Sequence, residues 1–160
     1  MIVDPGDRER VADLVDLHEG RLDVPLLDDE GVRRLLRESH RVAVIGASPD
    51  PYRPSNGVIR DLLALGYEIV PVNPAVDSVE GLTCYPDLGA AVESTGPVDI
   101  VDVFRRAAAC PTHAREAVAV GARCLWLQLG IASREAGRIA ASAGLEVVMD
   151  RCLAVEARRR

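Results

Sequence analysis

The sequence predicts an α/β fold with a mainly parallel, doubly wound, five-stranded sheet and helices on both of its faces. Two observations lead to this prediction. Short runs of β-branched residues alternate along the chain with segments whose apolar residues recur at helical spacing. The links between these segments are short, as they are where helices connect neighbouring parallel strands. Ligands of such sheets bind beyond the carboxyl ends of the strands, so we expect a site there.

Composition restricts the kinds of protein that this chain can be. Its 160 residues are 48% apolar and 28% charged, which fits one globular domain. The net charge of −6 argues against a nucleic-acid surface. The four cysteines form no CxxC motif, so neither a metal site nor a disulfide framework is expected. We recognise no signal peptide and no apolar run that could span a membrane, and we expect a cytoplasmic protein without a membrane partner.

The first part of the chain is acidic and precedes the alternating region. Within residues 1–27, apolar residues at helical spacing between Val11 and His18 favour a short helix. Asp28 has the chemistry of an N-cap for a second helix, which we expect to end near Glu38. We interpret this second helix as packed on the domain that follows and not as a domain of its own.

Five short runs of mostly apolar residues are expected to be strands, and four of them contain β-branched residues. They span residues 41–45, 68–70, 99–104, 124–127 and 145–149. Pro71 cannot donate a hydrogen bond to a ladder, so we expect the second strand to end there. The region 75–98 is less regular, and we expect a short strand near residues 83–85 and a short helix over 87–93.

Helix signals follow the first, third and fourth of these strands. Ser55 is expected to cap the first such helix, Pro111 to open the next and Ser133 to cap the last. A glycine follows each helix as the expected stop, at Gly66, Gly121 and Gly144. After the last strand, residues 154–160 are expected to be a basic tail, with Arg158, Arg159 and Arg160 frayed and solvated.

The loop between the first strand and its helix has the features of a phosphate-binding turn. Gly46, Ala47 and Ser48 are small, so a phosphate can approach the backbone closely. The unpaired N–H groups and the dipole of the following helix favour an anion at its start. Arg53 lies in the same loop, and guanidinium groups bind phosphate well. The sequence therefore predicts an anion site at this loop.

Two more arginines, Arg105 and Arg106, follow the third strand, which we expect to lie beside the first. A charge-assisted hydrogen bond contributes on the order of 1.5–3 kcal/mol, and charges beyond about 8–10 Å are screened. A few local arginines can therefore hold an anion although the chain has a net charge of −6. For Arg106, a solvated position without a ligand is an open alternative.

Common nucleotide-binding motifs do not fit this sequence. A dinucleotide fingerprint, GxGxxG, requires three glycines where the chain has Gly46, Ser48 and Pro51. The tip of the second strand carries Asn73 in place of the acidic residue that binds the ribose of NAD. The chain contains no lysine, so it has no phosphate-binding loop of the Walker type. Both NAD and ATP are therefore disfavoured.

Five motifs then occur in order along the chain. They are RVAVIGAS with RPS, GYEIVPVNP, VDIVDVFRR, LWLQLGI and VVMDRC. With these motifs, the chain resembles the small single-domain CoA-binding proteins, a Rossmann-like family related to the CoA-binding domain of the succinyl-CoA synthetase α subunit. The resemblance covers residues 26–153 and implies that residues 28–153 form a Rossmann-like domain that binds coenzyme A or an acyl-CoA.

The resemblance also implies which residues lie near the ligand, from its phosphates through its adenine side to the remainder. These residues are Gly46, Ala47, Ser48, Arg53 and Ser55, then Val72, Asn73 and Pro74, then Phe104, Arg105, Gln128, Gly130 and Ile131. They follow four different strands, whose carboxyl ends we expect to converge on one crevice. For Phe104, the only phenylalanine, a pocket wall and a core position are equally open interpretations.

The sequence indicates a binding protein with no catalytic residues of its own. No nucleophile, base and orienting acid can be assembled from the motifs. His113 is expected at the surface in a first helical turn, and Asp102 in the interior, where it would need a hydrogen-bond partner. Such a protein would sense, store or present the cofactor to a protein partner.

Two kinds of enzyme are the alternatives. One is an NAD(P)-linked oxidoreductase, and the other is an acyl-CoA-handling enzyme that uses the thiol of Cys110 or Cys152. Cys110 lies at a helix start, where the pKa of a thiol tends to fall. Cys152 follows the last strand, at the expected ligand edge. For both cysteines, a buried and unreactive position is the competing interpretation.

Overall fold

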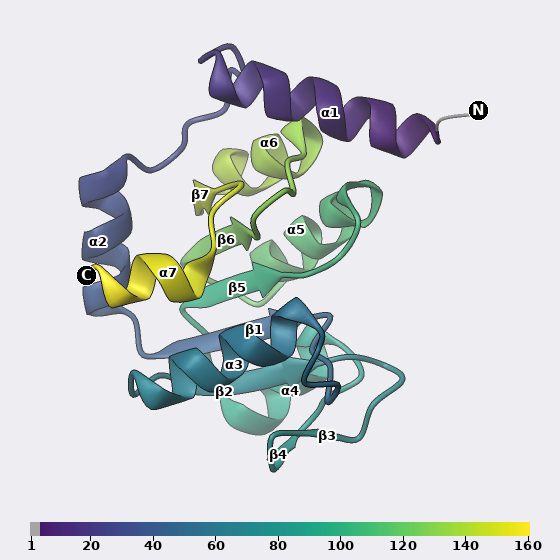
Figure 1. Ribbon diagram of the computed structural model, residues 1–160, viewed down its shortest axis with the longest axis vertical. Helices are drawn as coiled ribbons and strands as arrows, with labels where there is room; N and C mark the ends of the chain where they lie inside the picture. The colour runs from purple at the N-terminus through teal and green to yellow at the C-terminus, as the bar shows by residue number, and fades with distance from the viewer. Residues whose placement is uncertain (1–3) are drawn as a thin grey trace.

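A five-stranded parallel sheet forms the centre of the computed structural model, which describes residues 4–160 (Figure 1). Residues 1–3 of the predicted acidic segment lie outside the described residues. The strands are β1 (Arg41–Ile45), β2 (Glu68–Val72), β5 (Ile100–Val103), β6 (Cys124–Leu127) and β7 (Glu146–Val148). Their order is β2-β1-β5-β6-β7, with every neighbouring pair parallel. Because the chain winds outward from β1 in both directions, the predicted doubly wound, Rossmann-like α/β fold is confirmed.

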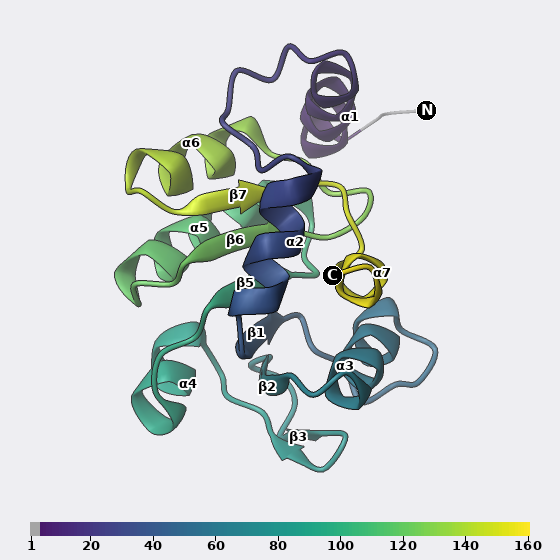
Figure 2. The same cartoon turned by 90° about the vertical axis from the view of Figure 1, so that its left-hand side faces the viewer.

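Helices cover both faces of this sheet (Figure 2). The side chains of α2, α3 and α7 pack on one face, and those of α4, α5 and α6 pack on the other, where α1 adds partly buried leucines. The predicted N-caps Asp28 and Ser133 accept hydrogen bonds from Gly31 N and Ala136 N at 2.7 and 3.1 Å. The helices are α1 (Pro5–His18), α2 (Asp29–Glu38), α3 (Pro54–Ala64), α4 (Leu88–Thr95), the 3-10 turn η1 (Ala107–Ala109), α5 (Cys110–Ala119), α6 (Arg134–Ser142) and α7 (Leu153–Arg158).

The second strand continues through Pro71, so our prediction that it ends there is wrong. β2 is an edge strand, and the carbonyl of Pro71 faces outward, where it accepts from Tyr85 N at 3.0 Å. The carbonyl of the next residue, Val72, faces β1 and accepts from Gly46 N at 3.0 Å. The missing N–H of the proline therefore removes no bond to β1.

Beyond β2, the chain forms a small antiparallel hairpin of β3 (Ser78–Val79) and β4 (Leu82–Thr83). Glu80 and Gly81 make its two-residue turn with φ angles of 51° and 76°, as a tight hairpin requires. The short strand that we expected at 83–85 thus lies slightly earlier.

α3 begins one residue before the predicted cap. Arg53 is the N-cap residue, Pro54 occupies the first turn, and Ser55 lies inside that turn with 3% of its surface exposed. Proline is favoured at this position because its fixed φ suits the helix and its missing N–H would be unpaired in any case. Ser55 therefore faces inward from the start of the helix and does not cap it.

The predicted basic tail over 154–160 is wrong in its first part, because Leu153–Arg158 form α7, whereas Arg158, Arg159 and Arg160 are exposed as expected. Ala154 and Ala157 of this helix are buried in the same apolar layer as α2 and α3. The last residue is also held: the Arg160 guanidinium lies 5.0 Å from the centroid of the Tyr67 ring. The C-terminal segment is therefore part of the domain.

One buried charge-bearing residue interrupts the aliphatic interior. Asp102 of β5 lies between Val44 and Trp126 in the ladder and is fully buried. Among the described residues, neither of its carboxylate oxygens has a hydrogen-bond partner. Burial therefore raises the pKa of Asp102 well above its ordinary value. The predicted interior position is confirmed, but the partner that we expected is not found.

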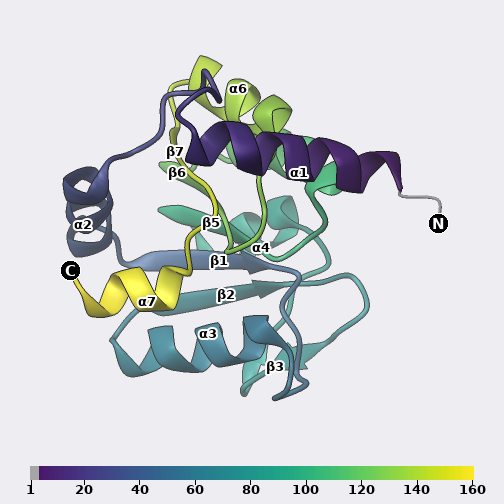
Figure 3. The ribbon, with the colours of Figure 1, turned by 45° about the horizontal axis from the view of Figure 1, so that its top comes forward.

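α1 lies beside α6, at the opposite end of the molecule from α3 (Figure 3). It buries no residue completely, and it is held by charged contacts together with the partly buried Leu14 and Leu17. Arg134, at the start of α6, binds the carboxylates of Asp16 and Asp23. His18 Nε2 lies 2.6 Å from Asp150, which follows β7. The predicted N-terminal helix is thus confirmed, and polar contacts attach it to the sheet domain.

Candidate functional site

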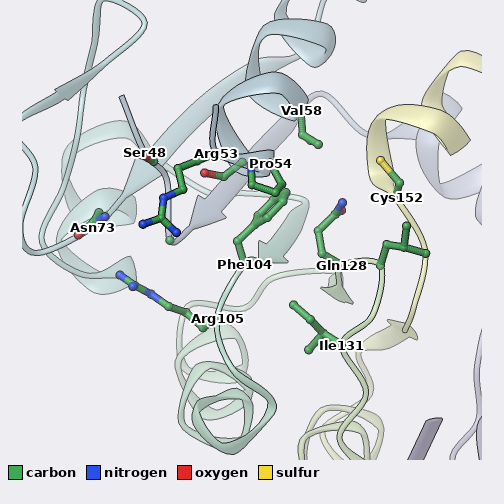
Figure 4. A pocket seen from close by; sticks show the side chains of 13 residues that line it. Ser48, Arg53, Pro54, Val58, Asn73, Phe104, Arg105, Gln128, Ile131 and Cys152 are labelled. Carbon is green, nitrogen blue, oxygen red and sulfur yellow. The ribbon is translucent and has the colours of Figure 1, made fainter. Parts of the chain in front are cut away.

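The carboxyl ends of four strands meet at one cavity of about 640 Å³, as expected (Figure 4). Loops that follow β1, β2, β5 and β6 supply most of its lining, and the starts of α3 and α7 supply the remainder. A volume of this size is typical of sites for cofactor-sized ligands. The predicted residues that line it are Gly46, Ser48, Arg53, Ser55, Asn73, Phe104, Arg105, Gln128 and Ile131.

Four of the predicted residues do not line this cavity. Ala47 and Val72 are buried in the core, with exposed fractions of 0% and 3%. Pro74 is exposed and does not line the cavity. Gly130 lines a separate cavity of about 170 Å³ against α1, and exposed Arg106 lines the same small cavity.

The sequence did not reveal all of the lining. Pro54, Val58 and Leu129 also face the cavity, and so does Cys152, which the sequence placed at the ligand edge. Val58 lies on the apolar side of α3, where helical spacing alone indicates a core residue. Leu129 is 68% exposed and follows Gln128, so its position beside a predicted residue was the available signal.

Close packing of two strand ends shapes the loop after β1. Gly46 has a φ angle of +85°, and a Cβ at this position would lie 2.6 Å from the carbonyl oxygen of Phe104. Only glycine fits both the backbone conformation and the close approach. Farther on, Ser48 Oγ accepts from Asp50 N at 3.1 Å, and the Asp50 carboxylate accepts from Tyr52 N at 2.9 Å. These bonds give the loop a defined path towards α3.

Two asparagines, one buried and one half-buried, hold the backbone of this loop through hydrogen bonds. Asn73 Nδ2 donates to Ala47 O at 2.8 Å, and its Oδ1 accepts from Ala75 N at 3.0 Å. Asn56, which is fully buried, donates to Ser48 O at 3.0 Å and to the Glu80 carboxylate at the same distance. Sequence reasoning missed Asn56, since a polar residue in a first helical turn carries no distinctive spacing.

Arginines dominate one end of the cavity. Arg53 and Arg105 reach this end, where Ser48 and Asn73 also lie (Figure 4). Among residues 4–160, neither guanidinium takes part in an ion pair, and no carboxylate lines the cavity. Two uncompensated positive charges in a chain with net charge −6 favour an anion at this end.

His113 is half-buried and not at the surface as predicted. Its side chain is 17% exposed, and its Nδ1 lies 3.2 Å from Glu116. The pKa of His113 is lowered overall. Burial is the largest cause, the positive charge of Arg105 also lowers the pKa, and the Glu116 carboxylate acts in the opposite direction. A neutral imidazole adds no further charge beside Arg105, and the ring is not among the cavity-lining residues.

The other end of the cavity is largely apolar. Val58, Ile131 and Cys152 line it, with Phe104 between this end and the arginines (Figure 4). Gln128 is the polar exception and is only 5% exposed. Its Oε1 accepts from Leu153 N, the first residue of α7, at 3.0 Å.

The four thiols differ in their access to the cavity. Cys110 is fully buried away from it, and burial raises the pKa of this thiol to about 12. The lowering that we expected from its helix start is wrong, because desolvation of the thiolate is the larger effect. Burial also raises the pKa of Cys84 and Cys124. In the described part of the chain, Cys152 is the one cysteine that lines the cavity.

Within residues 4–160, no group of three or more acidic, histidine or cysteine side chains is arranged to hold a metal ion. No described helix has the length and apolar character needed to cross a bilayer.

Comparison with known proteins agrees with this geometry. The family described as "CoA binding domain" matches residues 40–158. The chain belongs to the CoA-binding domain family. The match begins just before β1 and ends with α7, so it includes every strand of the sheet and leaves α1 and α2 outside. Among related sequences, YneT of Bacillus subtilis is 38% identical over 124 residues, which cover 78% of this chain and 90% of YneT.

Solved structures of similar proteins share this fold. A hypothetical protein of Pyrococcus horikoshii OT3 has a TM-score of 0.78 and 35% identity, over 83% of this chain and 92% of its own. The Thermus thermophilus protein named cell-free ID.343 has a TM-score of 0.76 and 38% identity, over 83% and 98% of the two chains. An acetyl-coenzyme A synthetase of Candidatus Korarchaeum cryptofilum, at TM-score 0.60 and 24% identity, covers 74% of this chain and 28% of its own length, and shows the shared fold alone.

Proposed function

We propose that this protein binds coenzyme A or an acyl-CoA in the 640 Å³ cavity and has no catalytic apparatus of its own. The main support is the pair Arg53 and Arg105, two guanidinium groups without ion-pair partners among the described residues, which reach the same end of the cavity. In the proposal, this end and the start of α3 hold the phosphates.

The two unlike ends of the cavity support the choice of ligand. Coenzyme A carries its phosphates on one part of the molecule and a neutral, thiol-terminated arm on the other. The arginine end suits the phosphates, and the end with Val58 and Ile131 suits the arm. Membership in the CoA-binding domain family gives independent support.

NAD fits the same cavity less well. A ribose-binding carboxylate is expected at the tip of the second strand, where this chain has Asn73. The amide of Asn73 is already bonded to Ala47 O and Ala75 N, so it has little capacity left for a ribose hydroxyl. Because His, Asp and Glu are missing from the lining in residues 4–160, a general base for an oxidoreductase or hydrolase is also hard to assign.

Calorimetric titration of the reduced protein with CoA, NAD and ATP tests this proposal. Saturable CoA binding with NAD and ATP silent is expected. Arg53→Ala should weaken CoA binding by about 10–100-fold, since one charge-assisted hydrogen bond contributes roughly 1.5–3 kcal/mol. Arg60→Ala, which removes an exposed arginine elsewhere on α3, is the matched control and should bind as the unmodified protein does. Binding of NAD alone, or equal CoA affinity in Arg53→Ala, would overturn the assignment.

A further inference from the structure

Gln128 presents an oriented hydrogen-bond donor to the cavity. The backbone N–H of Leu153 donates to Gln128 at 3.0 Å, so the atom that receives this bond must be the amide oxygen. The amide nitrogen is then fixed on the opposite side of the group, and it has no partner in the described part of the protein. Since Gln128 is 95% buried and lines the cavity, its N–H groups can bond only to something inside it.

Cys152 lines the same end of the cavity as the Gln128 amide (Figure 4). It directly precedes Leu153, the residue that binds Gln128. The end of the cavity opposite the arginines therefore carries both an amide N–H group that can donate a hydrogen bond and a thiol that can act as a nucleophile. A carbonyl group that carries a leaving thiolate, which is a thioester, matches both groups.

We infer that Cys152 takes up the acyl group of a bound acyl-CoA by thioester exchange. This inference rests on the proposed function, because the arginine end must first hold the phosphates. The Cys152 sulfur forms a bond to the acyl carbon, and the bond between that carbon and the CoA sulfur breaks. The Cys152 proton passes to the departing CoA thiolate. The products are S-acyl Cys152 and free CoA, and no oxidant or further reactant is needed.

Gln128 assists this exchange through its amide nitrogen. Negative charge develops on the acyl oxygen as the sulfur attacks, and a preoriented N–H donor stabilises that charge. Holding thiol and thioester in one cavity also gives them a high effective concentration. Among residues 4–160, no basic side chain lines this end, whereas Val58 and Ile131 do, so a neutral acyl group is the fitting cargo. The result is one acyl group loaded per chain and no catalytic turnover.

The other three cysteines cannot react in this way. Cys110 and Cys124 have no exposed surface, and Cys84 is 8% exposed. None of the three lines the cavity. The structure thereby distinguishes between the two thiols that the sequence alone left as alternatives, Cys110 and Cys152.

Intact-mass spectrometry after incubation with butyryl-CoA tests the inference. We expect the mass of one butyryl group on the full-length protein, located by peptide mapping at Cys152 and released by neutral hydroxylamine, which cleaves thioesters. Desulfo-CoA, which lacks the thiol, should suppress the adduct by occupying the cavity. Cys152→Ala should form no adduct, and Cys110→Ala is the matched control that should still form it.

The Gln128→Glu variant tests the amide N–H donor without removing the hydrogen bond that holds this side chain in place. This variant keeps an oxygen for the Leu153 N–H but lacks the two amide hydrogens, so adduct formation should slow by on the order of 100-fold. Saturable binding of butyryl-CoA without an adduct, or an adduct that survives in Cys152→Ala, would overturn the inference and leave the proposed function intact. If neither CoA nor butyryl-CoA binds in a titration, the proposed function itself fails.

Discussion

Asn73 donates a hydrogen bond to the carbonyl oxygen of Ala47 at 2.8 Å, and this bond joins the end of β2 to the loop after β1. The same side chain accepts from Ala75 N at 3.0 Å, so both ends of one amide are used. Asn73 therefore acts on the cavity by holding the backbone that precedes Ser48, in addition to lining it. The sequence suggested a contact with the ligand at this position, and the structure adds a supporting role.

Replacing Asn73 by alanine removes both bonds, and the free energy of unfolding should fall by about 1–3 kcal/mol. Asn73→Asp keeps the oxygen that Ala75 N needs but sets a carboxylate against the carbonyl of Ala47. We expect weaker CoA binding in both variants and no gain of NAD binding in Asn73→Asp. Thermal unfolding and calorimetric titration measure the two effects. NAD binding by Asn73→Asp would contradict the supporting role.

Arg105 and Arg106 provide a matched pair of adjacent arginines. Arg105 lines the 640 Å³ cavity, whereas Arg106 is exposed and lines the small cavity beside α1. Arg105→Ala should weaken CoA binding by about tenfold or more, while Arg106→Ala should leave it unchanged. Titrations at low and high salt should show a smaller salt dependence for Arg105→Ala, since one phosphate contact is lost. Equal losses in the two variants would indicate a diffuse charge effect and not a site.

Convergence of the strand ends could be predicted because it follows from topology. Once parallel strands alternate with helices, residues such as Ser48, Phe104 and Gln128 must reach the same edge of the sheet. The loop after β1 was also identified from the sequence, since Gly46 ends a β-branched run at that edge, but the positive φ of Gly46 was not predicted.

Other parts of the site could not be predicted for physical reasons. Helical spacing identified the apolar side of α3 but not that Val58, at the end of that side, faces a cavity. Because we predicted a tail at residues 154–160, we predicted neither α7 nor the hydrogen bond from Leu153 N that orients Gln128. The prediction that the second strand ends at Pro71 was wrong for a related reason. Proline is tolerated in an edge strand, and only the strand order shows that β2 is one.

The contacts of Arg134 predict that α1 can be loosened without unfolding the sheet. Arg134 binds Asp16 and Asp23, and α1 has no fully buried residue. Arg134→Ala should speed amide hydrogen exchange in α1 and leave exchange in β1 and β5 unchanged. Added salt should have the same effect in the unmodified protein. Arg115→Ala, which breaks an exposed pair with Glu135, is the control and should not affect α1.

Asp102 predicts an unusual dependence of stability on pH. Burial raises the pKa of this carboxyl in the folded protein, whereas in the unfolded chain the pKa is near 3.8. As the pH rises above that value, the unfolded chain releases the proton and the folded protein keeps it. The folded state then binds more protons, so Asp102 makes the free energy of unfolding fall with rising pH, by up to about 1.4 kcal/mol per pH unit. The fall ends when the pH passes the raised pKa of the folded protein.

Asp102→Asn has nearly the same size and polarity but cannot ionise, so it isolates this effect. Variant and unmodified protein should have similar stability near pH 3.5, and the variant should become progressively more stable than the unmodified protein as the pH rises. All other carboxyl groups are shared, so their contributions cancel in the difference. Urea unfolding at a series of pH values measures it. A difference that is constant with pH would mean that Asp102 ionises equally in both states, and that its burial is relieved by water or a partner in solution.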